Sequence, residues 1–200
     1  APLQEALDQL PVWACANAEG LPLQYERDGS PLALFYADIE EAQEELAASR
    51  EMYPDLGVDL IPVGLGQAYK LTCEAKALLM PGKEQLKVAK GPGGSSWPSS
   101  AVVPLFGCLE MSQPQEDGSP MLPLFLSNED AEKAVAKATA QMEGEVELEI
   151  ISLPLERAIE LLVNVPGTPA FKFVPPSSSM AYIRSYMGQG EVQDINKATQ

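Results

Sequence analysis

Histidine is absent from the 200 residues of the chain, and cysteine occurs only three times. Without the commonest general base and metal ligand, a Ser-His-Asp triad, a Cys-His pair and an imidazole-containing zinc site are excluded. Cys15, Cys73 and Cys108 lie far apart and form no Cys-x-x-Cys motif, which argues against a disulfide framework and a thioredoxin-like redox centre. An enzyme would have to work with carboxylates alone, and no spacing marks such a pair. We therefore expect a protein that is not an enzyme, with no catalytic residue, metal or cofactor.

Basic residues and long apolar runs are also scarce. The chain has 13 Lys and Arg against 29 Asp and Glu, a net charge of -16, and no basic cluster interrupts this charge. We therefore expect no nucleic acid partner and at most a peripheral contact with membranes. The richest apolar run, 102–109, is too short to cross a bilayer. The first residues show no basic and apolar leader, so we expect that any targeting segment has been cleaved or left out of this sequence, and the N-terminus indicates no compartment.

An internal repeat runs through the chain, in which 46% of the residues are hydrophobic and supply core side chains. Each half begins with a short apolar strand, passes a polar turn region and a Gly-Ser-Pro step, and continues with a second apolar strand. The matching strands are 10–15 and 103–108, then 32–37 and 121–126. This alignment places Trp13 opposite Phe106 and Tyr36 opposite Phe125.

A helix follows the second strand in both halves. Asp38 with Glu41, and Ser127 with Asp130, form the capping pattern of a helix N-terminus, and apolar residues then recur at helical spacing. A third strand and a second helix come next in each half. We expect these strands at 58–63 and 146–151, the helices at 67–80 and 155–162, and one extra strand at 169–176 in the second half.

The sequence therefore predicts an α+β protein, a pseudo-two-fold repeat of β-β-α-β-α units with helices packed on mixed or antiparallel sheet. The first repeat spans 1–90 and the second 101–186, and a Gly/Pro/Ser linker at 91–100 joins them. We expect the two repeats to form one compact body. The polar tail at 187–200 is expected to be an irregular surface segment or an arm that becomes ordered on a partner.

Several motifs, in the order in which they occur, resemble one protein family. They are LDQLPVW at 7–13, LFY at 34–36 before DIEEA at 38–42, YPDL at 53–56, IPVGLGQAYKL at 61–71, and LPLFLSNEDA at 122–131. Together they resemble the 22 kDa subunit family of the translocon at the inner envelope of chloroplasts, which is found also in cyanobacteria and in apicoplast-bearing parasites. The resemblance extends from residue 7 to about residue 173, and the segment 61–71 is its most specific piece.

The resemblance implies a non-catalytic, chaperone-like protein that binds polypeptides during import across the plastid envelope. The implied partners are transit peptides, precursors or translocon subunits, and the implied location is the chloroplast intermembrane space. The alternative is a peripheral structural or linker subunit of a photosynthetic membrane complex, a photosystem or an antenna, in the stroma or thylakoid lumen. The Pro-rich segments 90–100 and 113–120 and the tail depart from the family pattern and leave this alternative open.

Aromatic side chains are the candidate residues for binding a peptide or partner. Aromatic residues at equivalent places in the two halves would line a groove for an extended or amphipathic segment. The candidates are Trp13, Tyr36, Tyr69, Phe106, Phe125, Phe171 and Phe173. The competing interpretation is that these side chains fill the two cores. Acidic residues between 40 and 51 would likewise either attract basic transit peptides or form a solvated helix face.

Overall fold

A computed structural model describes residues 2–142, 144, 147–166 and 170–188. The first half opens with a short helix and continues with five strands and three further helices. These elements are α1 (Pro2–Asp8), β1 (Pro11–Ala16), β2 (Gln24–Arg27), β3 (Ser30–Tyr36), α2 (Ile39–Met52), β4 (Asp59–Gly64), α3 (Leu65–Cys73), β5 (Ala77–Met80) and α4 (Lys83–Val88). A single 3-10 turn at Pro54–Leu56 connects α2 to β4.

The second half repeats this order without a counterpart of α1. Its elements are β6 (Pro104–Gly107), β7 (Gln113–Pro114), β8 (Pro120–Phe125), α5 (Asn128–Gln141), β9 (Ile151–Pro154), α6 (Leu155–Asn164), β10 (Ala170–Val174) and α7 (Ser177–Gly188). Two more 3-10 turns lie at Pro92–Gly94, in the segment between the halves, and at Leu109–Met111.

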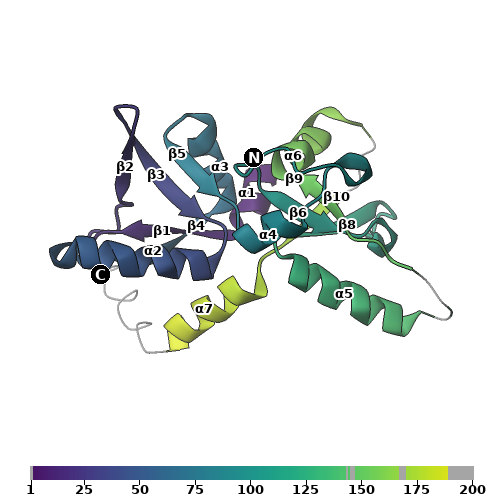
Figure 1. Cartoon of the computed structure of the whole chain (residues 1–200). Coiled ribbons are helices and arrows are strands. Elements are labelled where there is room, and N and C mark those ends of the chain that lie inside the picture. Colours follow the sequence, from purple (N-terminus) through teal and green to yellow (C-terminus); the bar gives the residue numbers. More distant parts are fainter. Residues whose placement is uncertain (1, 143, 145–146, 167–169, 189–200) are drawn as a thin grey trace.

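Each half forms one five-stranded sheet, and helices cover both sheets (Figure 1). The first sheet has the order β2-β3-β1-β4 with β5 beside β3, and the second has the order β10-β8-β6-β9 with β7 beside β8. The β5–β3 and β10–β8 pairs are parallel and the others antiparallel. The register also repeats, because Trp13 pairs with Tyr36 as Phe106 pairs with Phe125. The predicted α+β class, with helices packed on sheets, is thereby confirmed, and the two halves have the same order of strands and helices from β1 and from β6 onward.

The two long helices begin where the sequence predicts. The Asp38 carboxylate accepts a hydrogen bond from the Glu41 backbone N–H at 2.9 Å, and the Ser127 hydroxyl accepts one from the Asp130 N–H at 3.3 Å. Each cap satisfies an N–H group that the first helical turn leaves without an intrahelical partner. Two equivalent caps therefore start α2 and α5 at equivalent places.

Several expected boundaries are wrong. The helix expected at 67–80 ends at Cys73, because Ala75 adopts a left-handed conformation with φ of 56°, and β5 follows. The strand at 169–176 is therefore no extra element, since β10 is the counterpart of β5. The strand expected at 146–151 begins only at Ile151, where the pairing of β9 with β6 begins. In the expected tail, the backbone of 187–188 belongs to α7, and 189–200 lie outside the described residues.

The largest core cluster combines buried side chains from both halves. From the first half it includes Val12, Phe35 and Leu65, and from the second Leu105 and Leu124, all at most 1% exposed. Side chains alternate between the two faces of a strand, so Val12 lies in this shared core while Trp13 lies on the opposite face of β1. The shared core supports our expectation that the two repeats form one body.

None of the helices in the described part of the chain has the length and apolar character needed to cross a bilayer.

Candidate functional site

The outer face of the first sheet is apolar and is covered by α2 and, beside it, by α7. We call it the Trp13 face, and its buried residues are Trp13, Cys15, Ile39, Ala42, Leu46, Val58 and Leu60. From α7, Tyr182 and Ile183 pack against it. The Trp13 indole N–H donates a hydrogen bond to the buried Ser179 hydroxyl at 3.2 Å, and the Tyr182 ring meets the indole edge-on with centroids 5.2 Å apart. Figure 1 shows α7 below the sheets and near the middle of the molecule.

On the equivalent face of the second sheet, α5 takes the place of α2, and the second covering element is shorter. This Phe106 face consists of Ala89, Phe106, Phe125 and Ala131, with Trp97 at its edge. The short helix α4 and the segment after it lie over the face, and beside them is a hollow of about 840 Å³. Its lining mixes Phe106 and Ile150 with charged side chains such as Lys87 and Glu132.

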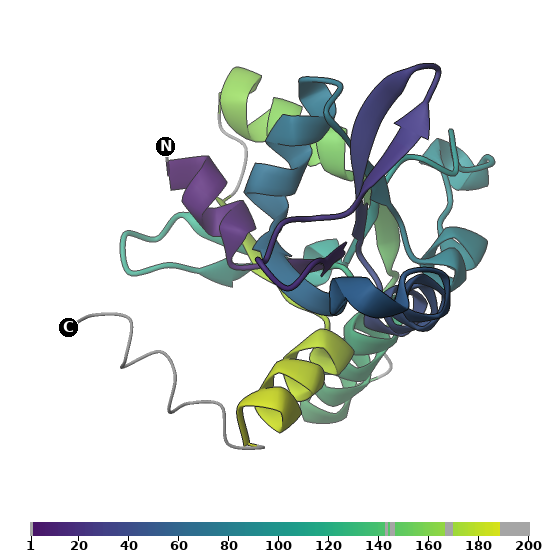
Figure 2. The same ribbon diagram turned by 90° about the vertical axis from the view of Figure 1, so that its left-hand side faces the viewer.

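On the opposite side of the molecule, α1, α3 and α6 border an open, apolar depression of about 340 Å³. We call it the α1–α3–α6 depression. Figure 2 shows α1 beside α3, with α6 further along the same side. Its lining residues are Leu3, Gln4, Leu7, Gly66, Tyr69, Lys70, Cys73 and Ile159.

Close helix packing shapes this depression. A Cβ atom on Gly66 would lie 2.8 Å from the Gln4 backbone oxygen, so only glycine allows α1 to lie this close to α3. The Asp8 carboxylate, at the end of α1, accepts a hydrogen bond from the Gln67 N–H at 2.9 Å. Burial, with a hydrogen bond to Cys73, raises the pKa of Tyr69 to about 12, so its phenol stays uncharged even above the pH at which an ordinary tyrosine ionises. The depression therefore offers an apolar, largely uncharged surface on a strongly acidic protein.

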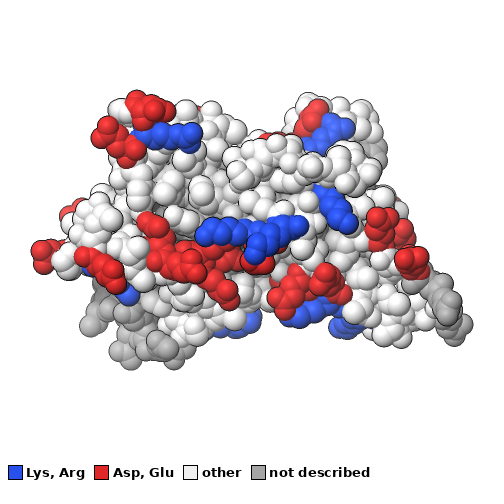
Figure 3. Space-filling view, viewed as in Figure 1, with Lys and Arg blue, Asp and Glu red and all other residues white. Residues whose placement is uncertain are grey.

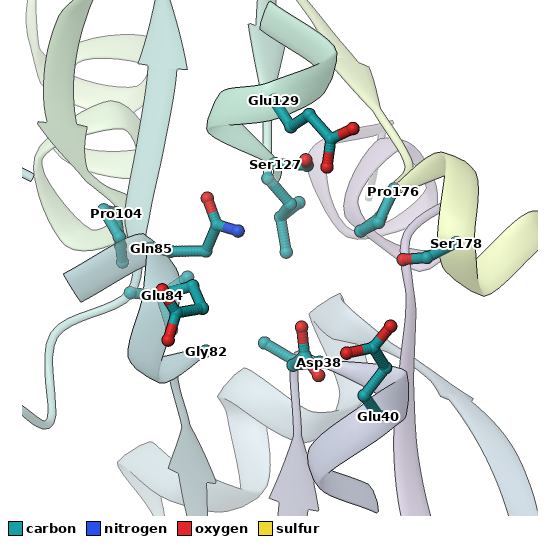
Figure 4. Close-up of a pocket in the computed structure, with 13 residues that line it drawn as sticks. Asp38, Glu40, Gly82, Glu84, Gln85, Pro104, Ser127, Glu129, Pro176 and Ser178 are labelled. Atoms are coloured by element: carbon teal, nitrogen blue, oxygen red, sulfur yellow. The ribbon is translucent and has the colours of Figure 1, made fainter. Parts of the chain in front are cut away.

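A smaller cavity of about 160 Å³ lies where the two halves meet. Figure 4 shows Asp38 and Glu40 of the first half facing Ser127 and Glu129 of the second across it. Around this cavity, a side chain of one helix accepts a hydrogen bond from a backbone N–H at the start of another helix. Glu41 accepts from the Lys83 N–H at 2.6 Å, and Gln85 from the Asn128 N–H at 2.7 Å. Carboxylates are favourable at helix N-termini, so these acids have a structural explanation.

Charge is distributed unevenly over the surface. Figure 3 shows acidic side chains along α2 and around the start of α5, and a strip of basic side chains over α4. Within the described residues, no group of three or more Cys, Asp or Glu side chains is arranged to hold a metal ion. Three acids of α2, Glu40, Glu44 and Glu51, are exposed to solvent.

Comparison with known proteins identifies the family. Residues 1–184 match the model of the Tic22-like family. The chain belongs to this family. The assignment confirms the resemblance that the sequence motifs indicated. Among curated proteins, no sequence matches the chain.

Two solved structures share the fold of this Tic22-like chain. Tic22 from Plasmodium falciparum superimposes with a TM-score of 0.76 at 20% identity, covering 100% of both chains. A structure from Anabaena described as Tic22 (protein transport) has a TM-score of 0.71 at 21% identity, covering 92% of this chain and 95% of that one. At this level of identity the similarity establishes a common fold across nearly the whole chain.

The aromatic residues predicted to bind a partner fall into three groups in the Tic22-like fold. Trp13, Phe106 and Phe125 are buried at 1%, 1% and 9% exposure on the two outer faces, where Tyr36 is half-buried beside Trp13. Phe173 is buried in the shared core, and its neighbour Phe171 is half-buried at the margin of that core. Of the seven, only Tyr69 lines the α1–α3–α6 depression.

The sequence prediction missed most of the residues that shape these surfaces. Leu3 and Leu7 of α1 were not assigned to any element, although Leu3 and Leu7 are four residues apart, a spacing typical of an amphipathic helix. Ser179 and Tyr182 of α7 were also missed. The apolar spacing within 177–188 is the signal that would have indicated this helix.

Proposed function

We propose that this protein binds segments of other polypeptides during protein transport across the plastid envelope, and that the α1–α3–α6 depression is a binding surface. Membership in the Tic22-like family supports the transport role, and the related Anabaena structure is described as a protein-transport protein. The observation that carries the site is the concave, apolar surface between three helices. Concave apolar surfaces with few polar groups are the usual binding sites for apolar ligand groups.

The chemistry of the surface indicates the kind of client. Leu3, Leu7 and Ile159 supply aliphatic contacts, and Tyr69 supplies an aromatic ring with a polar end. A net charge of -16 attracts basic segments over distances of several ångströms. Transit peptides are basic, poor in acids and amphipathic, so they match both properties. In this proposal the protein acts in the plastid, in the intermembrane space, by chaperone-like binding without catalysis.

The alternative role, as a subunit of a photosynthetic complex, gains no support from the family assignment. A pull-down from fractionated plastids distinguishes the two roles. Recovery of precursors and envelope translocon subunits supports the proposal, whereas a stoichiometric photosystem or antenna subunit contradicts it.

A binding experiment tests the site itself. Ile159→Ser places a polar group in the depression, whereas Val163→Ser makes the same kind of change one helical turn later, at a residue that is 65% exposed. We expect Ile159→Ser to weaken binding of a fluorescein-labelled transit peptide by about tenfold and Val163→Ser to leave it unchanged. Fluorescence anisotropy measures both affinities, and circular dichroism checks that both variants are folded. Equal affinity of the two variants contradicts the assignment of the site.

A further inference from the structure

The helices α4 and α7 are equivalent elements of the two repeats. Each follows the last strand of its half and begins against a carboxylate of that half's long helix. The Lys83 N–H donates to Glu41 at the start of α4, and the Ser177 N–H donates to Asp130 at 2.8 Å at the start of α7. Glu41 and Asp130 occupy the same capping position in α2 and α5. The start of α7 is therefore fixed by its own half of the molecule.

From these starting points, each helix crosses to the outer face of the opposite half. Ala89, directly after α4, packs with Phe106 in the second half. Tyr182 and Ile183 of α7 pack against the Trp13 face in the first half. The two crossing helices differ in length, because α4 has 6 residues and α7 has 12. The Trp13 face thus carries a longer helix than its counterpart.

The seating of α7 follows the pattern of a helix bound in a groove. Its four residues that face the first half are Ser179, Tyr182, Ile183 and Tyr186, at positions i, i+3, i+4 and i+7. Tyr182 meets Trp13 edge-on, and Tyr186 stacks on Tyr182 with centroids 6.3 Å apart and donates to Asp59 at 3.4 Å. Amphipathic helices that bind grooves of partner proteins use the same spacing.

Another helix could take the place of α7 on the Trp13 face. The α7 residue against the Trp13 indole is Ser179, so the most buried anchor is a hydroxyl and not a large apolar group. Tyr182 and Ile183 are only partly buried. The buried residues beneath them all belong to β1, α2, β4 and the residue before β4, so the face is built by the first half itself. Displacing α7 would therefore leave the Trp13 face formed.

We propose that the Trp13 face is a helix-binding groove, that α7 is its intramolecular occupant, and that an amphipathic helix from a client displaces α7. The client helix would present apolar side chains at i, i+3, i+4 and i+7. Its polar face would be basic, because the chain has a net charge of -16 and the exposed side of α2 carries Glu40, Glu44 and Glu51. That the occupant comes from a polypeptide client rests on the proposed function. The contact of α7 with the Trp13 face does not depend on it.

The test uses the full chain with Trp97→Phe, which leaves Trp13 as the sole indole. The probe is a synthetic Lys/Ala helix with four Leu at the i, i+3, i+4 and i+7 positions, and its control has the same composition with scrambled Leu positions. Anisotropy of a labelled probe reports binding, and Trp13 emission reports replacement of α7. We expect the patterned probe to bind and to change the emission, and the scrambled probe to do neither. Equal behaviour of the two probes overturns the proposal.

Variants of α7 give a second, independent readout. Tyr182→Ala removes the ring against Trp13, and we expect it to tighten probe binding by about tenfold because the free groove becomes more populated. Arg184→Ala changes an exposed residue of the same helix and should leave the affinity unchanged. If Tyr182→Ala is unfolded by circular dichroism, Asp130→Asn replaces it, since the Asp130 carboxylate accepts both hydrogen bonds from Ser177 at the start of α7. Unchanged affinity in the folded variant overturns the proposal.

Two further controls separate the possible explanations. Ile159→Ser, in the α1–α3–α6 depression, should leave the Trp13 emission change intact, so the failure of the proposed function and of this groove are distinguishable. Analytical ultracentrifugation tests whether a second copy supplies the occupant. A dimer that exchanges α7 between two chains would assign the groove to self-association and overturn the client assignment.

Discussion

Leu105→Ala tests whether the two halves of this protein unfold as one unit. Leu105 lies on β6 in the second half, is 0% exposed, and belongs to the core cluster that includes Val12 and Phe35 of the first half. Replacing a fully buried leucine by alanine removes apolar contacts and leaves a cavity, which costs about 2–5 kcal/mol of unfolding free energy. We expect this loss to reach both halves, because the damaged cluster contains both.

The two tryptophans allow each half to be followed separately. Trp13 lies in the first half and Trp97 at the edge of the Phe106 face in the second. Urea titrations of Trp97→Phe and Trp13→Phe backgrounds, each with and without Leu105→Ala, give four unfolding curves. With a urea dependence of about 2–3 kcal/mol per M for a chain of this size, we expect both midpoints to fall by about 1–2 M.

The matched control is Leu109→Ala, a nearby leucine of the second half that is 59% exposed. Because it buries little apolar area, we expect a loss below about 0.5 kcal/mol. If Leu105→Ala shifts only the Trp97 transition and leaves the Trp13 transition in place, the halves unfold independently. That result would refute the reasoning that the shared core joins them.

Three further predictions rest on single contacts. Gly66→Ala would bring a Cβ atom to 2.8 Å from the Gln4 backbone oxygen, so we expect α1 to be pushed away and the protein to lose about 1–3 kcal/mol, visible as a lower Tm; an unchanged Tm contradicts this close packing. Burial and the Glu45 hydrogen bond raise the pKa of Tyr25 to about 12, so stability present below about pH 10 should decline as the pH rises toward 12, measured by urea midpoints against pH. Loss of stability that begins well below pH 9 would not fit this cause. Of the three thiols only Cys73 is exposed, so a thiol reagent should modify one group rapidly in the native protein and all three in denaturant; three fast groups in the native state contradict the buried placement of the others.

Local sequence signals predicted those elements whose start is encoded within a few residues. Asp38 and Ser127 mark the helix starts because the capping interaction joins residues only three positions apart. The end of α3 at Cys73 was missed because the left-handed residue that follows it is Ala75, and alanine gives no glycine or proline signal. β5 was therefore read as a continuation of a helix.

The candidate sites were less predictable than the fold. The prediction that Trp13 is equivalent to Phe106, and Tyr36 to Phe125, agrees with the strand register, since Trp13 lies opposite Tyr36 in the first sheet as Phe106 lies opposite Phe125 in the second. Exposure could not be predicted, because it depends on which helix covers each face. The α1–α3–α6 depression also requires α1, which packs against α3 only because Gly66 leaves room for it.

The sequence by itself determined the charge, the absence of histidine chemistry, the internal repeat and the family, because composition and short-range patterns carry this information. Only the tertiary structure decided that the two halves share a core and that α4 and α7 cross to opposite halves. The contact between Trp13 and Ser179 joins residues 166 positions apart. Such contacts are selected by the packing of whole elements, and no local pattern at either residue specifies them.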